Sequence, residues 1–207
     1  GCILVTGTNG KTTTSLLLAH ILSHSGKKVI HNRSGANMLG GVATAFLQES
    51  NWRGKLPADI GVIEVDEASM PFVASQVRVK GVIVTNIFRD QLDRYGEVYY
   101  TLSRIKEGLK KAEPNDFIIL NADDPLLLDL KKDAKAPVYF YGISNWDIQE
   151  VFHAADINNC QQCGSPYFYL QNHLAHLGKY FCPGCGIKRP TPLYNMTWQK
   201  EKYTQST

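Results

Sequence analysis

The sequence predicts an α/β fold in which a mostly parallel sheet carries helices on both faces, together with a small cysteine-rich insertion. Short segments that are apolar throughout alternate with helical patterns, and strands that are buried on both faces have this continuous apolar character. A glycine-rich turn, GTNGKTTT at residues 7–14, joins the first apolar segment to a helical pattern. Two CxxC pairs follow near the other end of the chain, at residues 160–163 and 182–185.

The first half of the chain alternates strands and helices. Residues 2–6 (CILVT) are the first expected strand, and the spacing of apolar residues over 15–26 indicates a helix that stops at a glycine. A second short strand is expected at 27–31, followed by a helix around 42–50. The strand expected at 59–67 is apolar and ends in acidic residues, which places those acids at a strand end.

The second half continues the alternation. A short helix is expected at 70–77, and a strand rich in β-branched residues at 81–87. The segment 97–112 has the spacing of an amphipathic helix, with its apolar residues on one face. Two further strands, at 116–121 and 137–141, flank a helix expected at 125–133. Ligands of such sheets bind at the carboxyl ends of the strands, where the glycine turn and the acids fall.

The composition is that of an ordinary globular protein, since 43% of the 207 residues are hydrophobic and 20% are charged. The net charge of +3 is too small to argue for nucleic acid or an anionic membrane surface. No apolar run approaches the roughly 20 residues that a membrane-spanning helix needs. Because no Met precedes the first strand, we expect a fragment of a longer protein. Paired CxxC motifs indicate bound metal in a reducing compartment, so we expect a cytoplasmic protein.

The turn GTNGKTTT has the composition of a phosphate-binding loop. A glycine turn that enters a helix presents backbone N–H groups and the helix dipole to an anion. Lys11 would reach the outer phosphates, and the Thr12 hydroxyl would bind Mg²⁺. The glycines are closer together than in the usual pattern, so the loop is shorter, but its strand–loop–helix setting is intact. The expected nucleotide-binding residues are Gly7, Thr8, Asn9, Gly10, Lys11, Thr12 and Thr13.

This short loop resembles that of the Mur ligases and folylpolyglutamate synthetases, which implies ATP-dependent joining of a carboxylate to an amine. In that superfamily a glutamate at the end of a central strand helps to hold Mg²⁺. The segment IEVDEAS places Glu64 and Glu67 there, and Glu64 is preferred for its distance from the start of the strand. A solvated acidic strand end is the plainer alternative. The resemblance implies Lys11 and Glu64 as the catalytic pair.

The segment TNIFRDQLDRYGE resembles the Mur stretch in which an Asp-His pair follows a strand end and the histidine serves a second metal. Here the pair is Asp90 and Gln91, and an amide oxygen is a weaker ligand than imidazole. Asp90 and Asp93 are candidates for outer-sphere contacts with the metal. Arg94 is a candidate partner of phosphate or of a carboxylate. Lys106 falls where some Mur enzymes carry a carbamylated lysine, but a solvated lysine is preferred.

The two CxxC pairs predict a structural zinc ribbon. Eighteen residues separate the pairs, and four thiolates close a tetrahedral coordination sphere. The intervening segment 167–181 has the character of strands, and His173 and His176 are expected at the surface. The expected zinc ligands are Cys160, Cys163, Cys182 and Cys185.

Zinc ribbons also bind nucleic acid, so that function is weighed as an alternative. The segment carries only Lys179, Lys188 and Arg189, without a basic stripe or a long run of aromatic residues. A structural or docking role is therefore preferred for the ribbon.

The combination of NRSGANM, DQLDRYGE and the four cysteines resembles the MurT family of Mur-ligase-like subunits of lipid II isoglutaminyl synthase. The resemblance runs from Thr6 to about Tyr194. It implies an ATP-binding central domain over 1–152, a zinc-ribbon insertion over 153–192 and a return segment over 193–207 that stops before a C-terminal domain. It also implies ATP, Mg²⁺ and Zn²⁺ as cofactors.

The same resemblance implies the chemistry and the partner. ATP would phosphorylate the α-carboxylate of D-glutamate in lipid II at the membrane face, and ammonia from a glutaminase partner (the GatD subunit) would complete D-isoglutamine. The fragment alone is expected to bind nucleotide without completing this reaction. Two alternatives stay open: an amino-acid-adding Mur ligase or folylpolyglutamate synthetase, and a nucleotide-sensing or nucleic-acid-binding ribbon module.

Overall fold

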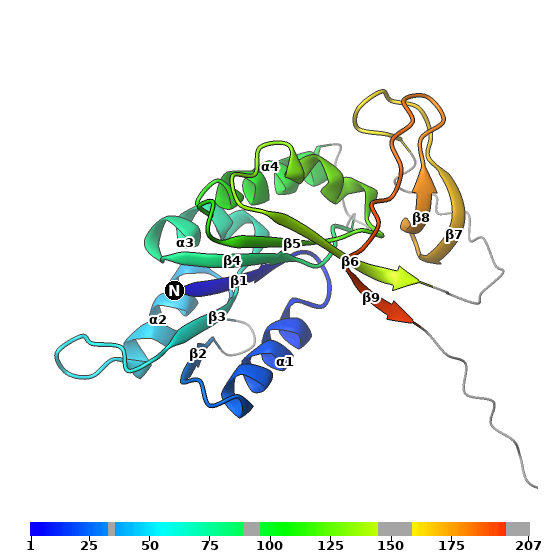
Figure 1. Ribbon diagram of the computed structural model, residues 1–207. Coiled ribbons are helices and arrows are strands. Elements are labelled where there is room, and N and C mark those ends of the chain that lie inside the picture. Colours follow the sequence, from blue (N-terminus) through cyan, green and yellow to red (C-terminus); the bar gives the residue numbers. More distant parts are fainter. Residues whose placement is uncertain (33–35, 89–95, 145–158, 198–207) are drawn as a thin grey trace, which may run out of the picture. The chain divides into compact units, whose positions relative to one another are not determined.

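The computed structural model describes residues 1–32, 36–88, 96–144 and 159–197 (Figure 1). Two compact units make up the chain. The first comprises Gly1–Leu120 with Leu126–Tyr139, and the second comprises Asn121–Pro125 with Phe140–Thr207. Within the described ranges, no helix has both the length and the apolar character needed to cross a membrane.

The first unit contains a parallel sheet in the order β2-β3-β1-β4-β5. The central strand β1 is buried along its whole length, as its continuous apolar sequence predicts. Its residue Val5 pairs with Glu64 of β3, so the acidic end of β3 lies level with the start of the glycine turn. The strands are β1 (Cys2–Thr6), β2 (Val29–His31), β3 (Ile60–Glu64), β4 (Val79–Val84) and β5 (Phe117–Asn121).

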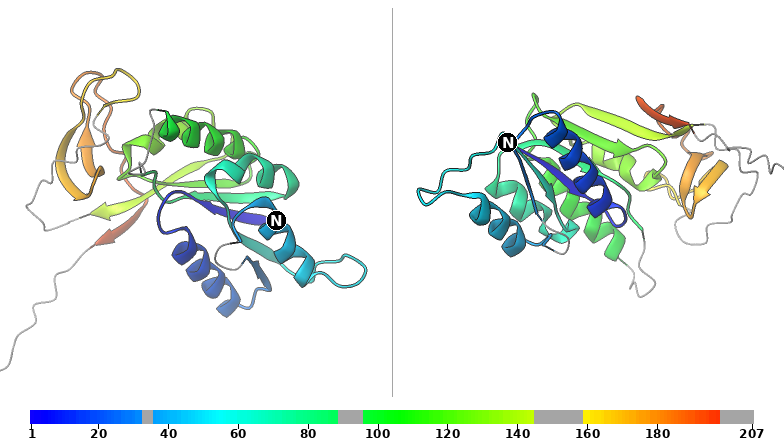
Figure 2. Two further views of the ribbon diagram at one scale, coloured as in Figure 1. Left: turned by 180° about the vertical axis from the view of Figure 1, so that it is seen from behind. Right: turned by 90° about the horizontal axis from the view of Figure 1, so that it is seen from below.

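Helices cover both faces of this sheet, which confirms the expected fold class. Helix α1 (Lys11–His24) lies on one face, and α3 (Met70–Gln76) and α4 (Glu97–Leu109) pack together on the other (Figures 1 and 2). Helix α2 (Leu39–Glu49) contacts β2 and α3. A 3₁₀ turn, η1 (Glu67–Ser69), follows β3 and directly precedes α3.

The helix expected over residues 125–133 forms instead as a 3₁₀ helix, η2 (Pro125–Lys131). With three residues per turn, side chains three apart lie above one another. Leu127 and Leu130 have this spacing, and both are buried, at 0% and 2% exposure. Leu127 and Leu130 therefore face the core together.

The second unit contains two separate strand pairs. Strand β6 (Val138–Ser144) pairs in parallel with β9 (Tyr194–Thr197). Strands β7 (Phe168–Leu174) and β8 (Leu177–Phe181) form an antiparallel hairpin, coloured from yellow to orange in Figure 1. The ring of Tyr180 is 1% exposed, and it is the largest fully buried side chain of the described residues.

Candidate nucleotide and metal sites

The glycine turn can exist only with glycine at its first position. Gly7 has a φ of +123°, and a Cβ there would lie 2.3 Å from Thr85 Oγ1 and 2.7 Å from the carbonyl oxygen of Asn86. Gly10 has a φ of +82° and is the N-cap of α1, and as a glycine it has no side chain that could cap the helix. The turn therefore lies close against the end of β4 and opens onto a helix end with unsatisfied N–H groups.

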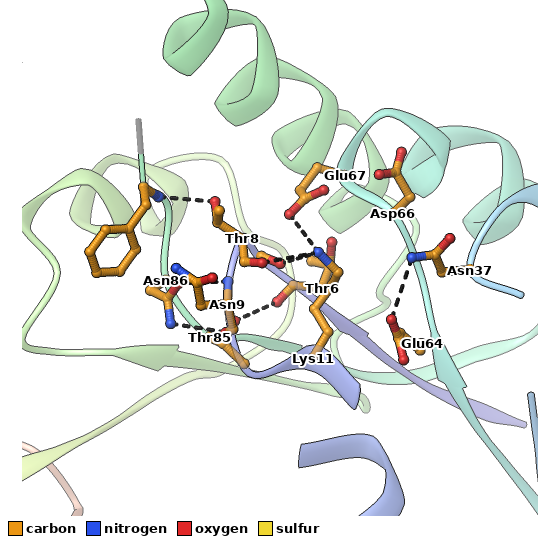
Figure 3. A network of polar contacts seen from close by, with 12 residues as sticks. Thr6, Thr8, Asn9, Lys11, Asn37, Glu64, Asp66, Glu67, Thr85 and Asn86 are labelled. Carbon is orange, nitrogen blue, oxygen red and sulfur yellow. Dashed lines mark hydrogen bonds and ion pairs between the residues drawn. The ribbon is translucent and has the colours of Figure 1, made fainter. Parts of the chain in front are cut away.

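Asn86, just beyond β4, holds the turn in place (Figure 3). Its Oδ1 accepts a hydrogen bond from the N–H of Asn9 at 2.9 Å, and its Nδ2 donates to the Asn9 carbonyl at 3.0 Å. Its own carbonyl accepts from the Thr8 N–H at 2.7 Å, while Thr8 Oγ1 accepts from the Phe88 N–H at 2.9 Å. Sequence reasoning placed Asn86 at a strand end but assigned it no role.

Lys11, the first residue of α1, folds back over the turn. Its Nζ donates to the Gly7 carbonyl at 2.6 Å and lies 3.1 Å from Glu67 Oε1 (Figure 3). Both side chains of this ion pair are 14% exposed. The ammonium group therefore lies directly above the backbone that would hold phosphate, with one carboxylate as its counter-ion.

Glu64, the last residue of β3, is 3% exposed. Asn32 fixes its backbone from both sides, accepting from the Glu64 N–H and donating to the Glu64 carbonyl, each at 2.8 Å. Asn37 Nδ2 is 3.4 Å from Glu64 Oε1. Among the described residues, Glu64 Oε2 has no hydrogen-bond partner. A buried carboxylate oxygen without a donor fits a metal ligand, since burial of an unpaired charge is otherwise costly.

Asn32 and Asn37 were not identified as site residues from the sequence. They lie in the segment NRSGANM. The resemblance of this segment to the MurT family was the only sign in the sequence that it has a role. Asn37 also accepts, through its carbonyl, the N–H of Asp66 at 2.9 Å. The two asparagines therefore shape the whole acidic end of β3.

The remaining predicted site residues differ in what the structure says of them. Thr12 is half-buried in the first turn of α1, and Thr13 beside it is exposed. Lys106 forms an ion pair with Asp133, and the hydrogen bond to that side chain raises the pKa of Lys106, as suits an ordinary charged lysine. The other candidates of the TNIFRDQLDRYGE segment, Asp90, Gln91, Asp93 and Arg94, lie outside the described residues.

The four predicted zinc ligands converge in the second unit. Their Sγ atoms all lie within 4.8 Å of one another, and all four thiols are free. The Cys160–Cys185 and Cys163–Cys182 sulfur distances are 3.6 and 3.4 Å, too long for disulfides. Sulfurs around a tetrahedral Zn²⁺ are about 3.8 Å apart, given Zn–S bonds of about 2.3 Å. The cluster therefore fits a closed zinc site.

Each knuckle is built in the same way. The N–H of Gly164 donates to the Cys160 carbonyl at 2.8 Å, and that of Gly186 donates to the Cys182 carbonyl at 2.9 Å. Both glycines have positive φ, +74° and +77°. Hydrogen bonds from the Ser165 hydroxyl and backbone lower the pKa of the Cys163 thiol to about 6.

The ribbon is tied to the turn Asn121–Pro125 within the second unit. Arg189 Nε lies 2.6 Å from Asp123 Oδ1, and the Gly178 N–H donates to the Asp123 carbonyl at 2.9 Å.

His176 Nε2 lies 3.3 Å from Asp124 Oδ1. The expectation that His176 is a surface residue is wrong, since it is 3% exposed. His173 is half-buried.

Comparison with known proteins agrees with this fold. The model of the Mur ligase middle domain matches residues 5–181. MurT, a subunit of the glutamine-hydrolysing lipid II isoglutaminyl synthase, is 38% identical in Streptococcus pneumoniae R6 over 94% of this chain and 43% of that protein. MurT of Staphylococcus aureus COL is 37% identical over the same shares. The chain therefore spans less than half the length of these curated relatives.

A solved structure agrees as well. A pseudomurein peptide ligase type C from Methanothermus fervidus superposes with a TM-score of 0.74 at 30% identity, over 96% of this chain and 38% of that one. The resemblance to MurT that the sequence motifs indicated is thereby confirmed. The chain belongs to the Mur ligase family and carries its middle domain.

Proposed function

We propose that the chain is the ATP-binding part of an amidating ligase subunit that activates the D-glutamate α-carboxylate of lipid II. The main support for this proposal is that three groups lie at the same edge of the parallel sheet. They are an uncapped helix N-terminus, the Lys11 ammonium and a buried Glu64 oxygen to which no described residue donates a hydrogen bond. The similarity to two MurT proteins supports the choice among ligases.

The phosphate loop supplies positioning and positive potential. The backbone N–H groups at the start of α1 would bind the phosphate oxygens of ATP, because they have no intrahelical acceptor. Lys11 would exchange its contact with Glu67 for the outer phosphates. Loose phosphoryl-transfer transition states gain most from this kind of preorganised charge neutralisation.

Glu64 is the residue that we assign to Mg²⁺, with Thr12 as the second protein ligand. The buried Glu64 carboxylate offers Oε2, whereas the Glu67 carboxylate is already the counter-ion of Lys11. Mg²⁺, when bound, would neutralise charge on the terminal phosphates. Asn32 holds Glu64 at the strand end, so the carboxylate does not need to reorganise.

The reaction would proceed in two steps. A carboxylate oxygen of D-glutamate attacks the γ-phosphorus, and ADP leaves with the electron pair of the broken P–O bond. Ammonia then attacks the acyl carbon, loses a proton and expels inorganic phosphate. Activation is required because a free carboxylate has no adequate leaving group.

The partner follows from the same proposal. Ammonia would come from a GatD-like glutaminase subunit bound to this protein as a heterodimer. The ribbon is assigned a structural Zn²⁺, because four thiolates leave no open coordination position. A cytoplasmic location, where ATP and glutamine are available, is part of the proposal.

Amidation of lipid II tests this function most directly. The protein at its full natural length, together with its glutaminase subunit, is expected to convert lipid II to the D-isoglutamine form with ATP and glutamine. Lys11→Ala should abolish turnover, because the phosphates lose their main cation. Lys27→Ala, which removes an exposed lysine just beyond α1, should retain it.

Two outcomes would contradict the proposal. Substantial amidation by Lys11→Ala would show that the loop is not the phosphate site. ATP turnover with a free amino acid, and none with ammonium or glutamine, would instead identify an amino-acid-adding ligase.

A further inference from the structure

The hairpin of the zinc ribbon exposes an apolar face. Phe168 of β7 pairs with Phe181 of β8, and their ring centroids are 5.1 Å apart. Phe168 is 55% exposed, and Leu170, two residues along the same strand, is 53% exposed. The hairpin register shifts between Tyr169 and Gln171, but Leu170 and Phe181 line the same cleft, so the three residues form one apolar patch outside the tyrosine core of the hairpin.

Two lysines border this patch. Lys179 lies two residues from Phe181 on β8 and is exposed, as is Lys188 beyond the second knuckle. Leu170, Phe181 and both lysines line one open cleft of about 450 Å³, together with Pro190 and Pro192. We refer to Phe168, Leu170, Lys179, Phe181 and Lys188 as the ribbon face. The face is thus apolar at its centre and cationic at its border.

The charged side chains of residues 159–197 are all of one sign. Residues 159–197 contain no Asp or Glu, and their only cations besides the two lysines belong to Arg189. Arg189 is already paired with Asp123, whereas no ion pair joins either lysine to a described carboxylate. The small net charge of the whole chain therefore conceals a local surface that favours an anionic partner.

We propose that the ribbon face is the surface with which the protein lies on an anionic lipid bilayer. Lys179 and Lys188 would meet headgroup phosphates, while Phe168, Leu170 and Phe181 enter the boundary between headgroups and acyl chains. The inference rests on the proposed function in one respect, namely that a lipid-linked substrate places the protein at a membrane. The face itself is a property of the described residues.

Two features favour a membrane over a nucleic acid. Two lysines can neutralise only two phosphates, whereas binding to a nucleic-acid backbone requires a longer basic track. Leu170 has no π-face on which a base could stack, but it partitions readily into a lipid interface. The mixture of aliphatic, aromatic and cationic side chains therefore fits lipid better.

Vesicle flotation with the zinc-loaded protein at its full natural length tests the inference. The protein should float with phosphatidylglycerol vesicles at low salt and much less with phosphatidylcholine vesicles. The double variant Lys179→Gln/Lys188→Gln should bind phosphatidylglycerol roughly 30-fold more weakly, because each lysine near an anionic surface contributes about a fivefold factor. Phe168→Ser, at an exposed position, should also weaken binding.

A matched control separates the ribbon face from total charge. Lys110→Gln/Lys111→Gln removes the same charge from two exposed lysines at the end of α4 and should leave flotation unchanged. Equal losses in both double variants, or none in Lys179→Gln/Lys188→Gln, would overturn the inference. Zinc content near one equivalent confirms that each variant is folded.

The same variants distinguish this inference from the proposed function. With detergent-solubilised lipid II, Lys179→Gln/Lys188→Gln should amidate at the wild-type rate, since no bilayer is needed. If the wild-type protein amidates lipid II normally but does not float with vesicles, only the membrane-binding inference is wrong. Salt-sensitive binding of single-stranded nucleic acid that the same double variant abolishes would assign the face to nucleic acid instead.

Discussion

Single residues decide which of two neighbouring carboxylates can serve a metal. Glu64 and Glu67 are three residues apart and were nearly equivalent candidates in the sequence. In the structure, Glu67 forms an ion pair with Lys11, and Glu64 is buried with an oxygen that receives no hydrogen bond from the described part of the chain. The distinction depends on Asn32 and Asn37, whose contacts with Glu64 join segments distant in the sequence. No local pattern could have revealed it.

The two glutamates should therefore respond differently to neutral substitution. Glu64→Gln is expected to weaken Mg²⁺-dependent ATP binding at least tenfold. Mutating a residue that only orients a metal ligand already costs about tenfold in metal affinity, and loss of the ligand itself should cost more. Glu67→Gln should tighten Mg-ATP binding about two- to fivefold, because phosphate no longer competes with the Glu67 carboxylate for the Lys11 ammonium. Titration calorimetry with Mg-ATP compares the variants. If Glu67→Gln weakens Mg-ATP binding and Glu64→Gln does not, Glu67 is the Mg²⁺ ligand instead.

At the scale of elements, the alternation of apolar strands and helical patterns was sufficient to predict the parallel sheet and its helices. Strands such as β1 are buried on both faces, and their sequence shows it without reference to the rest of the chain. The error at η2 arose because buried leucines at 3₁₀ spacing also satisfy an α-helical pattern. His176 was misplaced because its partner, Asp124, lies on a different element.

The ribbon is the element whose stability depends most on its metal. Cys160→Ser is expected to lower bound zinc well below one equivalent per chain, because three thiolates bind Zn²⁺ more weakly than four. The hairpin should then lose protection against proteolysis, while Mg-ATP affinity stays within about threefold of wild type. Metal analysis, limited proteolysis and calorimetry check these three results. Undiminished zinc in the variant would refute the ligand assignment.

For the molecule as a whole, family membership is established over residues 5–181, a range that includes the glycine turn and the acidic strand end. The four-cysteine cluster and the ties of Arg189 and His176 to the turn Asn121–Pro125 define the second unit. Sequence patterns predicted the parallel sheet with its helices and the four-cysteine cluster. They could not predict the asparagine contacts that position the site, because hydrogen bonds between distant segments leave no periodic signal.

The proposed function depends above all on binding of the ATP phosphates, with Mg²⁺, by the glycine turn. Isothermal titration of the zinc-loaded protein with Mg-ATP measures this directly. We expect one saturable site per chain, whose affinity for ATP falls when Mg²⁺ is omitted and is lost in Lys11→Ala. If folded protein that carries its zinc does not bind Mg-ATP, the glycine turn is not a phosphate site.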